Sequence, residues 1–166
     1  MADVLFFHGL ESGPQGHKAR WLRAHYDAAT PQLPTLESLE ATLAAARVAL
    51  KREAPRVLVG SSYGGAVAVA LAREGLVTVP MVLIAPAAQK VGVVNALPAG
   101  ARAVIFHARR DPIVPYEDSI ALADGSRAHA SVSLVTLESD DHALNALLDD
   151  GSLAEALAAF GVRRHA

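Results

Sequence analysis

The sequence predicts an α/β fold built on a mostly parallel sheet of about six strands, with helices on both faces. Short runs rich in β-branched and aromatic residues alternate with longer runs rich in alanine and leucine, as in strand–helix–strand units. Most of the short runs are continuously apolar, which is typical of strands that are covered on both faces. The 166 residues suffice for one hydrophobic core, so we expect residues 1–166 to form a single domain.

The expected elements follow one another along the chain. Strands are predicted at residues 4–8, 26–30, 56–60, 80–85, 103–107 and 131–137, of which the second has the weakest pattern. Helices are predicted at residues 35–52, 64–74, 116–123 and 152–160. The first helix has one apolar stripe, formed by Leu36, Leu39, Leu43, Ala46 and Leu50. Thr35 is its expected N-cap, and Gly75 is the glycine expected at the end of the second helix.

Composition and charge exclude several classes of protein. With 52% hydrophobic and 19% charged residues, the chain is an ordinary globular protein and not a disordered one. Its formal charge of −2, without any basic block, argues against nucleic acid or a membrane as partner. The absence of cysteine excludes disulfides and a thiolate nucleophile. Asp3 stands where a signal peptide carries lysines, so we expect a cytoplasmic protein.

Residues 60–64, Gly-Ser-Ser-Tyr-Gly, match the pattern G-x-S-x-G. They lie between a predicted strand and a predicted helix, the context in which a sharp turn exposes a nucleophilic serine. Gly60 and Gly64 are expected to leave room where strand and helix crowd together. The equivalent positions around Ser61 hold large residues, so Ser62 is the predicted nucleophile. The run lacks the lysine of a P-loop and the G-x-G of a dinucleotide site, which leaves a plain turn as the alternative.

A serine nucleophile needs a base that accepts its proton and an acid that orients the base. Asp111 follows the strand predicted at 103–107, and His142 follows the last predicted strand. Parallel strands end at one edge of a sheet, so Ser62, Asp111 and His142 are predicted to meet there. Three further acids lie near the histidine in the chain, namely Glu138, Asp140 and Asp141. Asp111 is preferred because these neighbours would have to fold back onto the ring.

The loop after the first strand supplies a second part of the predicted site. A tetrahedral intermediate carries a negatively charged oxygen that needs two N–H donors, one after the nucleophile and one from an early loop. The backbone N–H groups of Tyr63 and Leu10 are predicted to be these donors. Gly9 is expected to permit close approach of the backbone, and His8 is expected to fix the loop.

Together these residues resemble the α/β-hydrolase superfamily. The resemblance rests on His8-Gly9-Leu10, on residues 60–64, on Asp111 and on His142, and residues 7–18 are similar to those of small bacterial esterases that carry little or no lid. It implies a carboxylesterase-like serine hydrolase that forms an acyl-enzyme. No cofactor is expected, and no metal, because the sequence lacks the pattern H-E-x-x-H. The chain is shorter than usual for the superfamily, and residues 86–102 leave no room for a cap domain. The expected substrates are therefore short carboxylic esters or thioesters.

Two other functions stay open at this point. The fold could serve a non-catalytic binding module, or the same site could perform acyl transfer or a lyase reaction. Residues 91–97 contain Val91, Val93, Val94 and Leu97, which either line an acyl pocket or pack onto the core. The sequence is compatible with a monomer or a homodimer. If His142 is the base, kcat/KM should rise between about pH 6 and 8, because only the neutral ring accepts a proton.

Overall fold

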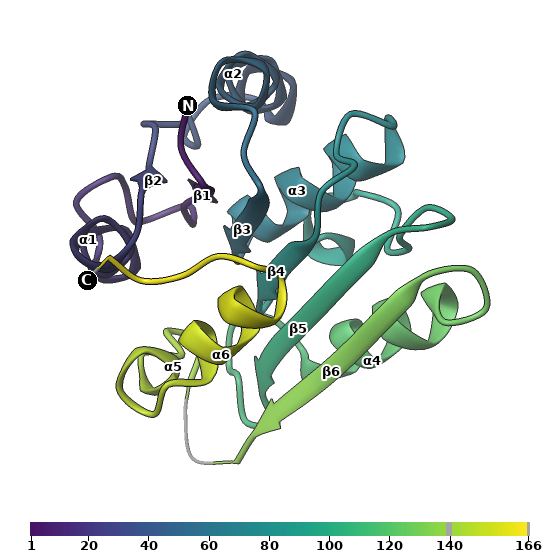
Figure 1. Ribbon diagram of the computed structural model, residues 1–166. Helices are drawn as coiled ribbons and strands as arrows, with labels where there is room; N and C mark the ends of the chain where they lie inside the picture. The colour runs from purple at the N-terminus through teal and green to yellow at the C-terminus, as the bar shows by residue number, and fades with distance from the viewer. Residues whose placement is uncertain (139–140, 166) are drawn as a thin grey trace.

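The computed structural model describes residues 1–138 and 141–165. Their strands form one sheet in the order β2-β1-β3-β4-β5-β6, with every neighbouring pair parallel (Figure 1). The strands are β1 (Val4–Phe7), β2 (Ala28–Ala29), β3 (Val57–Ser61), β4 (Met81–Ile84), β5 (Arg102–Ala108) and β6 (Ser131–Leu137). The predicted α/β class and the six-stranded parallel sheet are confirmed.

Helices cover both faces of this sheet (Figure 1). They are α1 (His17–His25), α2 (Leu39–Glu53), α3 (Tyr63–Arg73), α4 (Tyr116–Ser126), α5 (Ala146–Asp149) and α6 (Ser152–Ala159), with a short 3-10 helix η1 (Gln89–Val91). One hydrophobic cluster joins α2, α3 and α4 to one face of the sheet, and a second cluster joins α1, α5 and α6 to the other. The sheet is therefore the middle layer of three.

Strand β1 shows why these runs form buried strands. Leu5 and Phe7 belong to the cluster on one face, whereas Val4 and Phe6 belong to the cluster on the other. All four side chains are at most 3% exposed. Full burial of such a side chain stabilises the fold by about 1.5–3 kcal/mol, so a run that is apolar at every position is favoured in the centre of the sheet.

Helix α2 begins later than the sequence predicted. Its N-cap is Ser38, whose Oγ accepts the N–H of Ala41 at 3.1 Å. The predicted cap, Thr35, is buried and donates its hydroxyl to the carbonyl of Leu10 at 3.0 Å. Leu36 therefore lies outside the helix and is 88% exposed, which corrects its placement in the apolar stripe. The cap and the start of the helix were both predicted too early because Thr35 and Ser38 each carry a hydroxyl that can cap a helix.

Two helices were not predicted at all. Helix α1 buries only Ala19 and Leu22, too few apolar residues to give a helical pattern in a mostly polar run. Helix α5 has four residues, too few for any periodicity. Both helices pack into the second hydrophobic cluster, α1 through Ala19 and Leu22 and α5 through Leu147 and Leu148.

The strand order places a candidate site at one edge of the sheet. From β1 the chain goes to β2 on one side, and the later strands β3 to β6 follow on the other side. Ligands of such sheets bind at the carboxyl ends of the strands where the order reverses, here between β1 and β3. Residues 85–101 join β4 to β5 through η1 and loops, and no cap domain is evident in the described chain.

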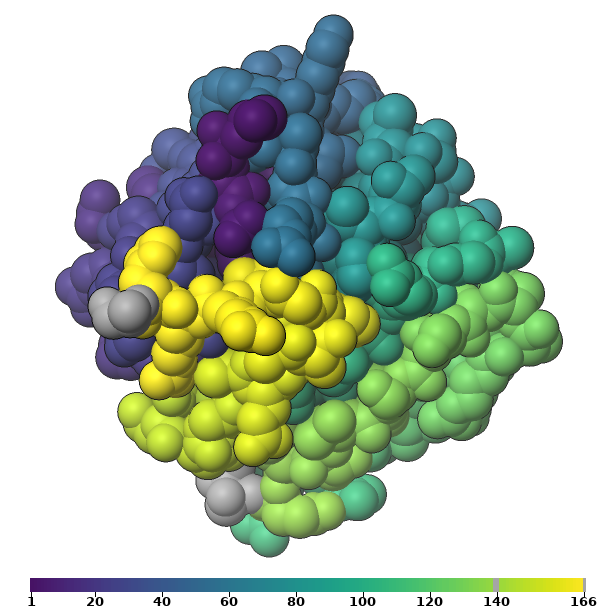
Figure 2. All heavy atoms as spheres, viewed as in Figure 1, coloured from purple at the N-terminus to yellow at the C-terminus, as the bar shows by residue number. Residues whose placement is uncertain are grey.

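The carboxyl-terminal residues return to the beginning of the chain. They follow α6 and lie against the amino-terminal part of the molecule (Figure 2), where the N–H of His165 donates to the carbonyl of His25 at 2.8 Å. Within the described residues, none of the helices combines the length and the apolar character needed to cross a membrane.

Candidate active site

Ser62 occupies a sharp turn between β3 and α3. Its φ of 54° and ψ of −114° are unfavourable for a residue with a side chain, and such strain persists only where the surroundings hold it. The N–H of Ser62 donates to the carbonyl of Ile84 at 2.8 Å. Its carbonyl accepts the N–H groups of Ala66 and Ala87, both at 3.1 Å. Neighbouring elements thus fix the backbone that presents the hydroxyl.

Three glycines make this turn possible. A Cβ on Gly60 would lie 2.6 Å from the carbonyl oxygen of Gly64, and a Cβ on Gly64 would lie 2.0 Å from that of Phe7. Gly65 lies just outside the G-x-S-x-G pattern and was not predicted to matter. A Cβ on Gly65 would lie 2.9 Å from Pro86. Helix α3 therefore starts in direct backbone contact with the ends of the strands.

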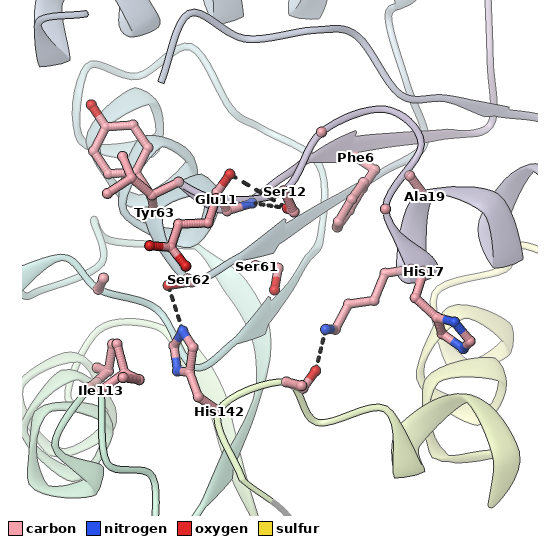
Figure 3. A pocket seen from close by; sticks show the side chains of 18 of the residues that line it. Phe6, Glu11, Ser12, His17, Ala19, Ser61, Ser62, Tyr63, Ile113 and His142 are labelled. Atoms are coloured by element: carbon pink, nitrogen blue, oxygen red, sulfur yellow. Dashed lines mark hydrogen bonds between the residues drawn. The ribbon is translucent and has the colours of Figure 1, made fainter. Parts of the chain in front are cut away.

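The structure brings together the predicted nucleophile, base and acid. The Nε2 atom of His142 lies 2.9 Å from Oγ of Ser62, and its Nδ1 atom lies 2.7 Å from Oδ2 of Asp111. A dashed line in Figure 3 marks the bond between His142 and Ser62. The side chain of His142 is 25% exposed, whereas that of Asp111 is fully buried. Since a carboxylate only accepts, Nδ1 carries the proton, and Nε2 of the neutral ring is free to accept the proton of the serine.

Asp111 is held as a carboxylate by its hydrogen bonds. Oδ1 accepts the N–H groups of Ile113 at 2.8 Å and Val114 at 2.9 Å. Burial alone would raise the pKa of Asp111, but the hydrogen bonds from His142, Val114 and Ile113 together bring it below its usual value. The group is therefore charged at neutral pH and can orient an imidazole.

The rival acids are engaged elsewhere or lie outside the described residues. Glu138 is exposed and pairs with Arg109 at 2.8 Å. Asp141 accepts the N–H of Ala143 at 2.9 Å through Oδ1. Asp140 lies outside the described residues. Asp111 is bonded directly to the ring of His142 through Oδ2.

A second histidine, which was not predicted to belong to the site, also contacts Asp111. His107, at the end of β5, is fully buried, and its Nε2 atom lies 3.0 Å from Oδ2 of Asp111 and 3.1 Å from the carbonyl of Val114. Its Nδ1 atom lies 2.7 Å from Oγ of Ser119. In the sequence His107 and Asp111 lie four residues apart. This spacing predicts a contact on a helix, but it predicts none between a strand and the loop that follows it.

Burial lowers the pKa of His107 and outweighs the opposing influence of Asp111 and the carbonyl of Val114. Four titratable groups of the described residues face its ring: Asp111, Asp118 and Tyr116 of α4, and His142. The ring is therefore neutral at neutral pH. Both acceptors near Nε2 require a proton there, so Nδ1 accepts the hydroxyl proton of Ser119.

A neutral buried His107 makes stability depend on pH. Free imidazole takes up a proton near pH 6.5, so the unfolded chain binds more protons than the folded chain as pH falls from about 7 to 5. The free energy of unfolding then decreases over this interval. We expect urea denaturation to show a smaller decrease for His107→Gln than for the wild type. An equal decrease in the two proteins would contradict the neutral state of His107.

The loop after β1 presents a predicted oxyanion donor. No hydrogen bond among the described residues uses the backbone N–H of Leu10 or of Tyr63. Nδ1 of His8 donates to the carbonyl of Gly9 at 2.8 Å, while its Nε2 accepts the N–H of Leu33 at 3.0 Å. The carbonyl of Gly9 and the N–H of Leu10 belong to one peptide plane, so the buried ring of His8 fixes the direction of that N–H.

Gly9 lies in the same loop, next to the nucleophile. A Cβ on Gly9 would lie 3.6 Å from the carbonyl oxygen of Ser61 and 3.6 Å from Cβ of Ser62, which are ordinary van der Waals contacts. Its φ is not positive. The protein around Gly9 therefore leaves room for a methyl group, and the close approach of a substrate to the backbone at this position stays a prediction.

A pocket of about 600 Å³ opens above Ser62. Figure 3 shows Ile113 and Phe6 on opposite sides of the serine and histidine, and Glu11 pointing toward Ser62. The apolar lining of the pocket includes Ala87, Val91, Ile113 and Val114, and its charged or titratable lining includes Glu11, His17, Lys18 and Lys90.

The loop between β4 and β5 contributes less to this pocket than its apolar residues suggested. Val91 lines the pocket. Leu97 is 1% exposed and belongs to the core, Val93 packs against the core, and Val94 is 60% exposed. Of the two predicted alternatives, packing onto the core therefore applies to most of this stretch.

Metal ligands do not gather in the part of the chain that the structure describes: no group of three or more His, Cys, Asp or Glu side chains could hold an ion there.

Comparisons with known proteins agree on one fold. The profile of an uncharacterised protein family, UPF0227, matches residues 3–97. A protein from Xanthomonas campestris pv. campestris, described as belonging to the alpha/beta superfamily of hydrolases, is similar with 26% identity and a TM-score of 0.74, over 95% of this chain and 98% of that one. No curated protein matches the chain.

Two esterases are more distant in sequence and similar in fold. Est1E from Butyrivibrio proteoclasticus has 16% identity and a TM-score of 0.74, over 95% of this chain and 87% of that one. The esterase domain of a Rhodothermus marinus protein has 22% identity and a TM-score of 0.66, over 97% and 87% of the two chains.

Proposed function

The chain belongs to the uncharacterised protein family UPF0227 and has the fold of the α/β-hydrolase superfamily, and we propose that it is a serine hydrolase of small carboxylic esters or thioesters. The observation that carries this proposal is the continuous line of hydrogen bonds from Ser62 through His142 to Asp111. The description of a similar structure as a hydrolase supports it.

In the proposed reaction, Oγ of Ser62 attacks the carbonyl carbon while Nε2 of His142 takes its proton. The buried charge of Asp111 stabilises the imidazolium that forms. The backbone N–H groups of Leu10 and Tyr63 donate to the negatively charged oxygen of the tetrahedral intermediate. His142 then returns the proton to the departing alkoxide or thiolate, and the acyl group stays on Ser62 as an ester.

Water completes the proposed cycle. His142 removes a proton from a water molecule, which attacks the acyl carbon and forms a second tetrahedral intermediate. Its collapse breaks the bond to Oγ of Ser62, which regains its proton from His142. The products are a carboxylic acid and the alcohol or thiol released earlier, and the protein returns to its starting state.

The pocket supports small substrates. Its volume of about 600 Å³ lies in the range of sites for small molecules, and no cap domain is evident over it. Val91 and Ile113 offer an apolar surface to an acyl chain, and Ile113 is 50% exposed. A long acyl chain would therefore extend into water and add little binding energy.

A panel of p-nitrophenyl esters tests this proposal. We expect kcat/KM to be highest for acetyl and butyryl esters and to fall toward palmitoyl. Ser62→Ala should lower kcat by at least about 10⁴-fold, because no nucleophile remains. Activity on palmitoyl esters alone, or full activity of Ser62→Ala, would contradict the proposal. Analysis of the products in the presence of an added alcohol distinguishes hydrolysis from acyl transfer.

A further inference from the structure

The carboxylate of Asp111 is shared by two histidines. Its Oδ2 atom accepts Nδ1–H of His142 at 2.7 Å and Nε2–H of His107 at 3.0 Å, and the side chain has no contact with solvent. Its other oxygen is occupied by two backbone N–H groups. Four donors from the chain thus fix both the position and the rotation of the carboxylate, and water has no access to replace one that is lost.

His107 is itself fixed from its far side. Oγ of Ser119, a fully buried residue of α4, lies 2.7 Å from Nδ1. The ring also makes an edge contact with Tyr116, with 5.7 Å between ring centroids. Helix α4 therefore holds the ring in the orientation that directs Nε2–H at Asp111.

We propose that His107 is a positioning residue for the proposed hydrolysis: its Nε2–H holds Oδ2 of Asp111 toward His142 and takes up part of the carboxylate charge. A line of hydrogen bonds then runs from Ser119 through His107, Asp111 and His142 to Ser62. Without His107, Oδ2 keeps one donor, and the whole charge of that oxygen acts on His142. The imidazolium of His142 is then stabilised more strongly, so the ring releases its proton at higher pH.

Two amide variants separate this role from a merely structural one. In His107→Gln, the side-chain amide reaches the former place of Nε2 and can still donate to Asp111. In His107→Asn, the shorter amide reaches the place of Nδ1, so it can still bond to Ser119 but not to Asp111. Both variants remain polar and smaller than or similar to histidine. His129→Gln, which alters a histidine bonded to the carbonyl of Leu97, is the matched control outside the site.

The first measurement needs no substrate. Histidine resonances of isotope-labelled protein, followed by NMR against pH, give the midpoint at which His142 takes up a proton. We expect His107→Asn to raise this midpoint by about 0.5–1 pH unit, and His107→Gln and His129→Gln to leave it close to the wild type. Around His142 or its pocket lie the groups Asp111, Ser62, Glu11, His17, Lys18 and Lys90, and they are identical in all four proteins.

Ester hydrolysis is the second measurement. His107→Asn should lower kcat by about ten- to a hundredfold, the factor expected for one lost hydrogen bond to a charged group, because Asp111 is then no longer held in line with His142 and this loss outweighs the stronger stabilisation of the imidazolium. KM should stay within about twofold. The acidic limb of its kcat/KM profile should move to higher pH together with the NMR midpoint. His107→Gln should recover most of the activity.

The two measurements distinguish the possible failures. A wild type that cleaves no ester contradicts the proposed function, and the NMR midpoints still report whether His107 controls His142. An active wild type combined with an unchanged midpoint and pH profile in His107→Asn contradicts the role of His107. If His107→Asn does not fold, Ser119→Ala keeps the ring but removes the hydrogen bond that fixes its orientation from the far side, and it should raise the midpoint by a smaller amount. No rise in that variant would also contradict the proposal.

Discussion

Asp111→Asn is expected to lower kcat by about 10⁴-fold while KM changes little, because the buried side chain of Asp111 is not among the residues that line the pocket. Oδ1 faces two backbone N–H groups, which can only donate. The amide nitrogen of asparagine must therefore take the place of Oδ2. There it donates to Nδ1 of His142 and forces the proton to Nε2. The ring can then no longer accept the proton of Ser62.

Glu138→Gln is the matched control for this prediction. It removes a charge from the strand end nearest His142, but Glu138 pairs with Arg109 at the surface. Its kcat should stay within about twofold of the wild type. The comparison is made by ester hydrolysis on folded protein of equal concentration. A kcat of Asp111→Asn above about a tenth of the wild-type value would mean that another acid orients His142.

Gly64→Ala is expected to destabilise the protein by about 4 kcal/mol or more, which places it among the exceptional substitutions. The added Cβ would lie 2.0 Å from the carbonyl oxygen of Phe7 and 2.7 Å from that of His8. Both obstacles are backbone atoms, so α3 must move away from the end of β1. The same movement separates Leu10 from Tyr63, and we expect activity to be lost with stability.

The fold offers a matched glycine for comparison. Gly125 lies within α4, and a Cβ there would meet nothing within 4 Å. Because alanine favours a helix over glycine by about 1 kcal/mol, Gly125→Ala should stabilise the protein by up to that amount. Urea denaturation should show a lower free energy of unfolding for Gly64→Ala and a higher one for Gly125→Ala than for the wild type. A Gly64→Ala protein as stable as the wild type would show that α3 and β1 are not held in backbone contact.

The sheet could be predicted because its signal is local. Each central strand is buried on both faces, so its run is apolar at every position, and the predicted boundaries lie within two residues of the observed ones. Helix α1 could not be predicted, since its stability comes from Ala19 and Leu22 packing on the second face of the sheet. The start of α2 could not be predicted either, because Thr35 is bonded to the carbonyl of Leu10 instead of capping the helix, and no local pattern contains that contact.

The residues of the candidate site also fall into those that a local sequence pattern predicts and those that depend on distant contacts. Ser62 was recognisable from the two glycines that its turn requires, and Asp111 and His142 from their places after strands. His107 was not, because its bond to Asp111 depends on how the loop after β5 turns back over the strand end. Gly65 was missed because the obstacle is Pro86, a residue that follows a different strand.

The central claim is that Ser62 is an activated nucleophile, and labelling tests it most directly. Folded wild type and Ser62→Ala are exposed to a fluorophosphonate probe, and each intact protein is weighed by mass spectrometry. We predict one adduct on the wild type, located at Ser62 by peptide mapping, and none on the variant. A folded wild type that takes no label, or a Ser62→Ala protein that still takes one, would contradict the account.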